Sequence, residues 1–152
     1  MDERERVLLT LAGMRALMGI VWLSLLFGKF PPGFGRHTRD GLMHTFRLAE
    51  QHAAIGPLRD LVRRLVIPHF SIFGWIIFLV ELAVGILLLT GFYTRIGAWA
   101  GLVASLVVVV FLGRTPHTWR FALVLFVAWH VVLVLTPCAR RLSLDDRLGR
   151  DP

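Results

Sequence analysis

The chain has 152 residues, of which 56% are hydrophobic and only 18% are charged, and its formal net charge is +7. A water-soluble domain of this size needs more polar side chains to cover its surface, so the composition excludes a soluble domain and predicts an all-α, multi-pass membrane protein. Arginine carries nearly all of the positive charge, and no basic run is interleaved with aromatic residues. This pattern argues against nucleic-acid binding and favours the lipid bilayer and a small anionic substrate as partners.

The apolar runs predict one membrane domain over residues 1–152, built as a bundle of four transmembrane helices. A run of about 20 residues crosses the hydrocarbon core of a bilayer, which is about 30 Å thick. The spans are expected at about residues 7–27, 71–90, 96–112 and 119–136, and an interfacial amphipathic helix at about residues 57–67.

The first span carries a cation and a large aromatic ring on one face. Arg15, Gly19 and Trp22 follow the spacing i, i+4, i+7, which places them on the same side of a helix. A charged group within a span is expected to face the interior of the bundle, so this face should turn inward.

The long first loop begins with glycines and prolines between Gly28 and Gly35, which end the helix and predict a turn at the membrane surface. The loop also carries Lys29, Arg36 and Arg39. Its histidines lack a repeated short spacing, so no metal site is expected. Residues 57–67 place apolar side chains on one stripe and arginines elsewhere, as in a helix that lies in the membrane interface.

The second span has a carboxylate, Glu81, near its centre. An ionisable group at that depth costs about 2.5–3.5 kcal/mol on insertion scales, so it usually has a partner and often a function. Glu81 therefore marks either a functional site or a structural hydrogen bond to a neighbouring helix.

The third and fourth spans differ in character. Gly97, Gly101 and Ser105 recur every four residues in the third span, which predicts close packing against another helix. The fourth span contains His130, which is either part of a buried site or a neutral histidine that donates to a backbone carbonyl.

Three ionisable residues are expected at a common depth in the bundle. If the midpoints of the apolar runs lie at the bilayer centre, the depths of Arg15, Glu81 and His130 differ by only about 2 Å at 1.5 Å per residue. The sequence therefore predicts an ion pair between Arg15 and Glu81, with His130 close enough to alter their charge state.

Several short motifs, taken in order, resemble those of the DoxX-like membrane proteins. The motifs are Arg15-xxx-Gly19, Gly28-Lys29, Glu81-xxx-Gly85 and Gly91-xx-Thr94-Arg95. The long first loop and the sequence Ile67-Pro68-His69-Phe70 further resemble the DoxD branch, the membrane subunit of thiosulfate:quinone oxidoreductase. The resemblance implies four transmembrane helices, a link to quinone-coupled sulfur oxidation, and functional roles for Arg15, Lys29 and Glu81.

The first functional hypothesis is a quinone-reducing membrane subunit. Glu81 would exchange the proton that accompanies electron transfer, Arg15 would set its charge state, and His130 or Trp22 would contact the quinone ring. A haem is not expected, because a transmembrane bis-histidine site needs two deep histidines on facing helices. Electrons must then pass directly from substrate to quinone or through a second subunit. The alternative is a non-enzymatic assembly, partner-binding or transport-linked protein in which Arg15 and Glu81 form a structural pair.

The end of the first span predicts a second site. Lys29, Arg36 and Arg39 are expected to hold a small oxyanion such as thiosulfate at the outer surface, unless Lys29 only extends toward the lipid headgroups. An even number of spans places both termini on one side, which we expect to be the cytoplasmic side of the cell (inner) membrane. A second subunit or a homo-oligomer is compatible with the sequence.

Overall fold

The computed structural model describes residues 2–39, 41–116 and 120–136, and within these ranges the secondary structure is entirely helical. The helices are α1 (Glu3–Ser24), α2 (Leu42–His52), α3 (Gly56–Leu61), the π-helical turn η1 (Val62–Val66), α4 (Phe70–Thr90), α5 (Thr94–Leu112) and α6 (Arg120–Leu135). The tail beyond residue 136 lies outside the described residues. Residue 119, where the fourth predicted span begins, lies outside them too.

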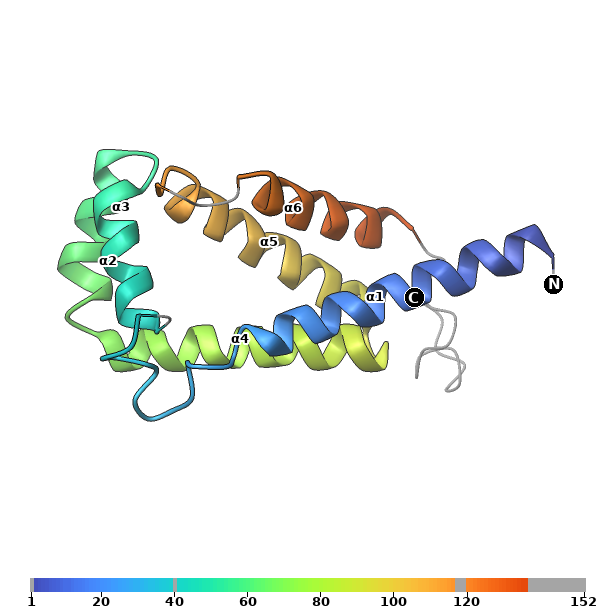
Figure 1. The fold of residues 1–152 in the computed structure, drawn as a ribbon, viewed down its shortest axis with the longest axis horizontal. Coiled ribbons are helices and arrows are strands. Elements are labelled where there is room, and N and C mark those ends of the chain that lie inside the picture. The colour runs from blue at the N-terminus through green and yellow to red at the C-terminus, as the bar shows by residue number, and fades with distance from the viewer. Residues whose placement is uncertain (1, 40, 117–119, 137–152) are drawn as a thin grey trace.

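The helices form two antiparallel pairs that meet at one end and diverge toward the other (Figure 1). In one pair α1 packs against α4, in the other α5 packs against α6, and a short turn joins α4 to α5. Helices α2 and α3 lie across the diverging end and form a cap (Figure 1). Two hydrogen bonds fix this cap to the end of α5, because Ala54 N–H donates to the Val110 carbonyl (3.0 Å) and Arg114 donates to the Ala54 carbonyl (2.7 Å).

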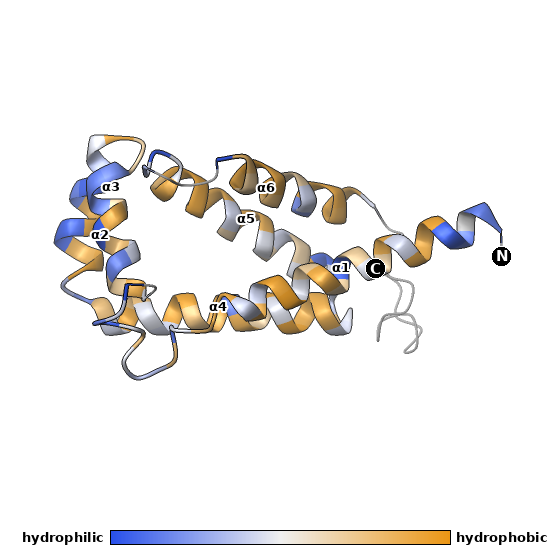
Figure 2. Cartoon of the chain, viewed as in Figure 1, coloured by the Kyte–Doolittle hydropathy of each residue, from blue (hydrophilic) through white to orange (hydrophobic). Residues whose placement is uncertain are grey.

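Three described helices, α1, α4 and α5, are long and apolar enough to cross a membrane, and α6 is a shorter apolar helix. Apolar residues dominate these helices along most of their length, whereas polar residues gather on the cap (Figure 2). Large side chains such as Ile72, Leu79 and Val103 are more than half exposed, which a lipid environment accommodates and water does not. The chain is therefore a multi-pass, all-helical membrane protein.

Glycines set the distance between the paired helices. A Cβ atom on Gly19 of α1 would lie 2.5 Å from the backbone nitrogen of Leu89, and one on Gly85 of α4 would lie 2.7 Å from the Leu23 side chain. The predicted small-residue row of α5 is confirmed, because Gly97, Gly101 and Ser105 are all buried. Close backbone approach of this kind is the usual way in which membrane helices associate.

The predicted helix boundaries are correct to within a few residues, with one element missed. Helix α3 continued by η1 occupies the region that was predicted to be an interfacial helix, whose place at the interface stays a prediction, and the spans at 71–90 and 96–112 correspond to α4 and α5. Helix α2 lies in what the sequence predicted to be a loop. Its buried residues Leu42, Phe46 and Ala49 follow the spacing i, i+4, i+7, which is the signal that was available for it.

Candidate functional site

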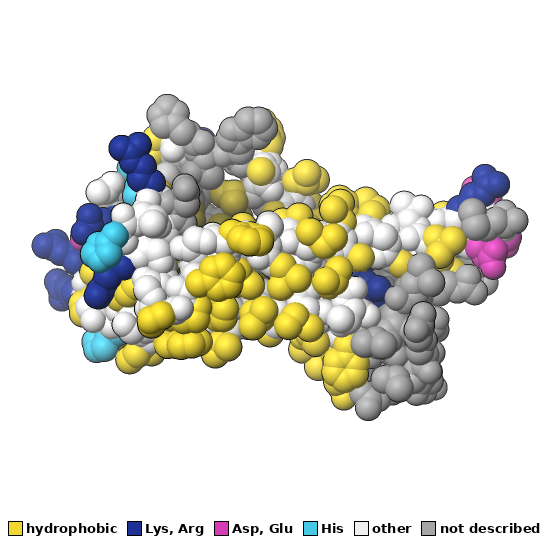
Figure 3. Space-filling view, turned by 60° about the horizontal axis from the view of Figure 1, so that its bottom comes forward, with side chains coloured by type: hydrophobic (Ala, Val, Ile, Leu, Met, Phe, Trp, Pro, Cys, Tyr) yellow, Lys and Arg dark blue, Asp and Glu magenta, His cyan; other side chains and the backbone are white. Residues whose placement is uncertain are grey.

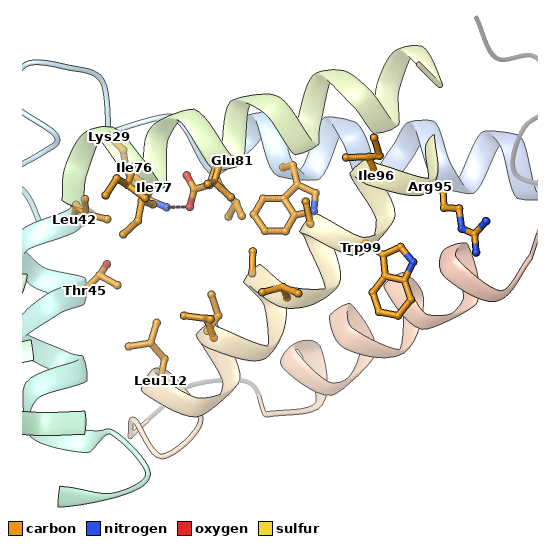
Figure 4. A pocket seen from close by; sticks show the side chains of 18 residues that line it. Lys29, Leu42, Thr45, Ile76, Ile77, Glu81, Arg95, Ile96, Trp99 and Leu112 are labelled. Atoms are coloured by element: carbon orange, nitrogen blue, oxygen red, sulfur yellow. Dashed lines mark hydrogen bonds and ion pairs between the residues drawn. The ribbon is translucent and has the colours of Figure 1, made fainter. Parts of the chain in front are cut away.

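A large cavity of about 1000 Å³ lies between α4 and α5 and reaches α2 (Figure 4). Its lining comes from α1 and the segment after it, α2, α4 and α5, and most of it is aliphatic. Ligand sites are typically concave and mostly apolar, with a few polar groups that orient the ligand. The charged or hydroxyl groups of the lining are Lys29, Thr45, Glu81 and Arg95.

Glu81 and Lys29 form an ion pair at the wall of this cavity. Lys29 Nζ donates to Glu81 Oε1 at 2.7 Å (Figure 4). Glu81 is 8% exposed, and its second oxygen, Oε2, is buried without a hydrogen-bond partner among the described residues. A buried carboxylate with one unsatisfied oxygen is costly, and it has the capacity to accept a hydrogen bond or a proton.

The partner of Glu81 is therefore Lys29, and the expected pair between Arg15 and Glu81 is wrong. Gly19 packs against Gly85 and Leu89, so Arg15, one turn before Gly19, lies beyond Leu89 and away from Glu81. The predicted common depth is wrong because α1 begins before the C-terminal end of α4 and ends beside its middle, so the midpoints of the two helices do not coincide (Figure 1). Arg15 is buried, at 2% exposure, but it does not line the cavity.

His130 is held by hydrogen bonds of its own. Trp22 Nε1 donates to His130 Nε2 at 3.0 Å, and His130 Nδ1 lies 2.8 Å from the Phe126 carbonyl oxygen. Both contacts are satisfied by a neutral ring that carries its proton on Nδ1. His130 does not line the cavity, so the geometry gives it the role of orienting Trp22, which does.

Gly101 provides the space for this histidine. A Cβ atom at position 101 would collide with the His130 ring, so only glycine leaves room for the imidazole between α5 and α6. The small-residue row of α5 thus has two uses, because it brings helices together and it admits the ring that orients Trp22.

Arg36 and Arg39 lie apart from Lys29. The Arg36 guanidinium is 5.0 Å from the centre of the Phe70 ring and borders a second cavity of about 310 Å³ near the start of α4. Arg39 is exposed, and neither arginine lines the large cavity. Lys29 turns into the bundle, so the structure does not join these three residues into one site.

Three polar or aromatic residues of the cavity lining were not predicted from the sequence. Thr45 comes from α2, which was not expected to be a helix, while Arg95 and Trp99 come from the first turns of α5. Figure 4 shows Thr45 on the same side of the cavity as Lys29, and Arg95 at the opposite end. A spacing of i, i+4 between Arg95 and Trp99 was the signal that they share a helix face.

One comparison with known proteins found a match. The family model described as "TQO small subunit DoxD" matches residues 44–151. The matched part includes Glu81, His130 and the α5 wall of the cavity, whereas Trp22 and Lys29 precede it. The comparison with curated proteins and the comparison with solved structures gave no match.

Proposed function

The chain belongs to the DoxD family, and from this premise we propose that it is the membrane subunit of a quinone-coupled oxidoreductase with thiosulfate or a related sulfur compound as electron donor. The main support is a single observation, an apolar cavity whose wall holds the Lys29–Glu81 ion pair. Such a cavity suits a molecule that has a small polar head and a long apolar tail.

The shape of the lining fits a lipid-soluble quinone. On α5 the lining extends from Arg95 to Leu112, which is about 26 Å at 1.5 Å per residue. Lys29 has hydrogens to donate to a carbonyl oxygen of the quinone head, and the Trp22 and Trp99 rings offer flat apolar surfaces. The aliphatic side chains along α5 would cover the tail.

Quinone reduction takes up two electrons and two protons. A reduced sulfur compound supplies the electrons, and water supplies the protons. Glu81 would take up a proton from water and pass it to a quinone oxygen, while Lys29 would fix the position of the carboxylate through the 2.7 Å contact. No haem or metal is required of this chain in the proposal, because the electrons would arrive from the donor directly or through a second subunit.

The second subunit is proposed from the family description, which names a small subunit. For the anionic donor, we propose Arg36 and Arg39 as surface contacts, since Arg36 borders the smaller cavity. Lys29 would act in the large cavity instead, because its ammonium already binds Glu81.

We further propose that α6 is the fourth span and that both termini lie in the cytoplasm, so that the cap lies on the outer face of the cell (inner) membrane. Helix α3 and η1 would lie in the interface, because Leu61 and Leu65 are exposed beside Arg59, Arg63 and Arg64. Efficient labelling of an Arg95→Cys variant by an impermeant thiol reagent outside intact cells would reverse this orientation.

Turnover tests the proposed function directly. Membranes that contain the chain should reduce a quinone in the presence of thiosulfate, and Glu81→Gln should lower kcat by at least about 100-fold with little change in the KM for quinone. Glu50→Gln, a surface carboxylate change, is the matched control and should keep full activity. Equal activity of Glu81→Gln and Glu50→Gln, at equal amounts of folded protein, would contradict the proposal.

A further inference from the structure

Helix α1 covers only the C-terminal half of its partner α4. Its contacts place Gly19 beside Leu89 and Leu23 beside Gly85, and the helix ends at Ser24. Helix α4 continues for more than ten residues toward Phe70, and α1 does not accompany it (Figure 1).

A non-helical segment, Leu25–Phe34, covers the other half of α4. Lys29 contacts Glu81, the Phe30 ring lies 6.2 Å from the Phe78 ring, and the Phe34 ring lies 6.2 Å from the Phe70 ring. From Glu81 to Phe70 the helix rises by about 16 Å, so the segment follows a membrane-spanning helix over about half the thickness of the hydrocarbon core. The segment therefore continues the crossing from the end of α1 to the cap, with irregular backbone at membrane depth.

Irregular backbone at this depth is tolerated only where protein buries it or where it lines a water-filled cavity. Parts of Leu25–Phe34 meet these conditions, whereas the Phe27 and Phe30 side chains are 74% and 56% exposed. Phe34 is 1% exposed within the cap, while Leu25 and Lys29 line the large cavity. The Lys29 side chain retains 16% exposure beside the carboxylate, so a molecule the size of water reaches the ion pair.

The polar groups of the cavity are not evenly spread. Thr45, Lys29 and Glu81 lie toward the cap, whereas Arg95 lies at the opposite end (Figure 4). A fixed cation opposes the arrival of protons from its own end. The polar end of the cavity is therefore the end through which protons would come.

We propose that the non-helical segment Leu25–Phe34 lines a water-filled access path from the cap to Lys29 and Glu81. Protons reach Glu81 along this path from the side of the membrane on which α2 and α3 lie. This inference rests on the proposed function in one respect, because the protons that the path delivers are those that quinone reduction consumes. Glu81, ionised in its pair with Lys29, takes one proton from water in the path and releases it to the quinone oxygen, so its own charge is restored after each transfer.

Cysteine accessibility tests the path without any need for turnover. Single cysteines are placed in a Cys138→Ser background at Leu25 and Thr45, which line the cavity, and at Leu79, an exposed α4 residue outside the lining. Arg63→Cys on the cap and Arg95→Cys on α5 identify the two sides. A charged, membrane-impermeant thiol reagent is then applied to each side of sealed vesicles.

The path predicts that Leu25→Cys and Thr45→Cys react from the same side as Arg63→Cys. Both should react at least about 10-fold faster than Leu79→Cys, because a thiol must ionise in water before it reacts. Failure of Leu25→Cys to react faster than Leu79→Cys, or its reaction from the Arg95 side, would overturn the proposal.

Hydrogen–deuterium exchange of the unmodified chain in lipid nanodiscs gives a second test that no folding defect can disturb. Amides of residues 25–34 should exchange at least about 10-fold faster than those of residues 76–86 on α4, since helical amides at membrane depth are protected. Equal protection would contradict a wet path. Loss of quinone binding with rapid exchange and labelling would instead contradict the proposed function and leave the path standing.

Discussion

At the scale of single residues, burial separates the Lys29–Glu81 pair from a surface pair such as Arg63–Glu50. The side chains of Lys29 and Glu81 are 16% and 11% exposed and 2.7 Å apart, whereas the Arg63 side chain is 74% exposed and its contact with Glu50 is 3.7 Å long. Breaking a buried pair leaves one charge without compensation, which costs about 3–5 kcal/mol. An exposed pair contributes about 0–1 kcal/mol.

A double-mutant cycle should therefore show strong coupling within the buried pair. Lys29→Met and Glu81→Leu should each lower the stability of the purified protein more than the double variant does, because the double change leaves no buried charge. Denaturation in detergent measures the cycle. The cycle Arg63→Met with Glu50→Gln is the matched control and should be additive within about 0.5 kcal/mol.

Additive losses at Lys29 and Glu81 would show that the two side chains do not interact in the membrane. The same cycle distinguishes the two candidate partners of Glu81. Arg15→Leu combined with Glu81→Leu should be additive, since the contacts of Gly19 place Arg15 beyond Leu89 on α4.

At the scale of helices, the position of α1 along α4 decides which cation reaches Glu81. Gly19 and Gly85 allow close approach only where they face the partner backbone, so they fix the register of the two helices. With this register Lys29 falls beside Glu81. The sequence contained both glycines, but it gave no measure of how far α1 projects past the end of α4.

Substitution of a glycine in α1 should destabilise the fold only at the contact with α4. A Cβ at Gly19 would lie 2.5 Å from the Leu89 backbone, while one at Gly13 would have no atom within 4 Å. Gly19→Ala should cost about 1–3 kcal/mol through overpacking. Gly13→Ala should be neutral or stabilising by up to about 1 kcal/mol, because alanine favours helix. Thermal unfolding that ranks the two variants equally would contradict the register.

The transmembrane helices were predictable from the sequence because long apolar runs have few alternatives in a membrane. Helix α2 was harder to predict, because its apolar stripe is short, is interrupted by polar residues and follows a stretch rich in glycine and proline. Glu81, Lys29 and Trp22 were identified from residue type and family resemblance. Their arrangement was not, because it depends on where α1 ends and on the non-helical course of Leu25–Phe34 along α4.

At the scale of the whole molecule, two helix pairs diverge from one turn, and the cap closes the wide end. The turn is possible because Gly91 ends α4 in the left-handed conformation, with φ of 69°. Figure 3 shows an apolar belt along the spans and arginine and histidine side chains gathered at the cap. Because the two pairs diverge, a cavity remains between α4 and α5. The arrangement of the helices therefore creates the proposed site.

The proposed function requires this cavity to bind a quinone. Val103 and Leu106 lie on α5, but only Val103 lines the cavity, while Leu106 is 46% exposed outside the lining. Val103→Trp should fill the space available to the ligand, whereas Leu106→Trp adds the same ring on the lipid side and serves as the matched control.

The most direct test is the affinity of a photoreactive quinone analogue for the purified protein in lipid nanodiscs, followed by identification of the labelled peptides. We expect the analogue to label peptides of α4 and α5, and an excess of unmodified quinone to prevent this labelling. The affinity of the analogue should be at least about 10-fold weaker in Val103→Trp, which corresponds to about 1.4 kcal/mol, and unchanged in Leu106→Trp. Equal affinity of the two variants, or no specific labelling of the folded protein, would contradict this expectation.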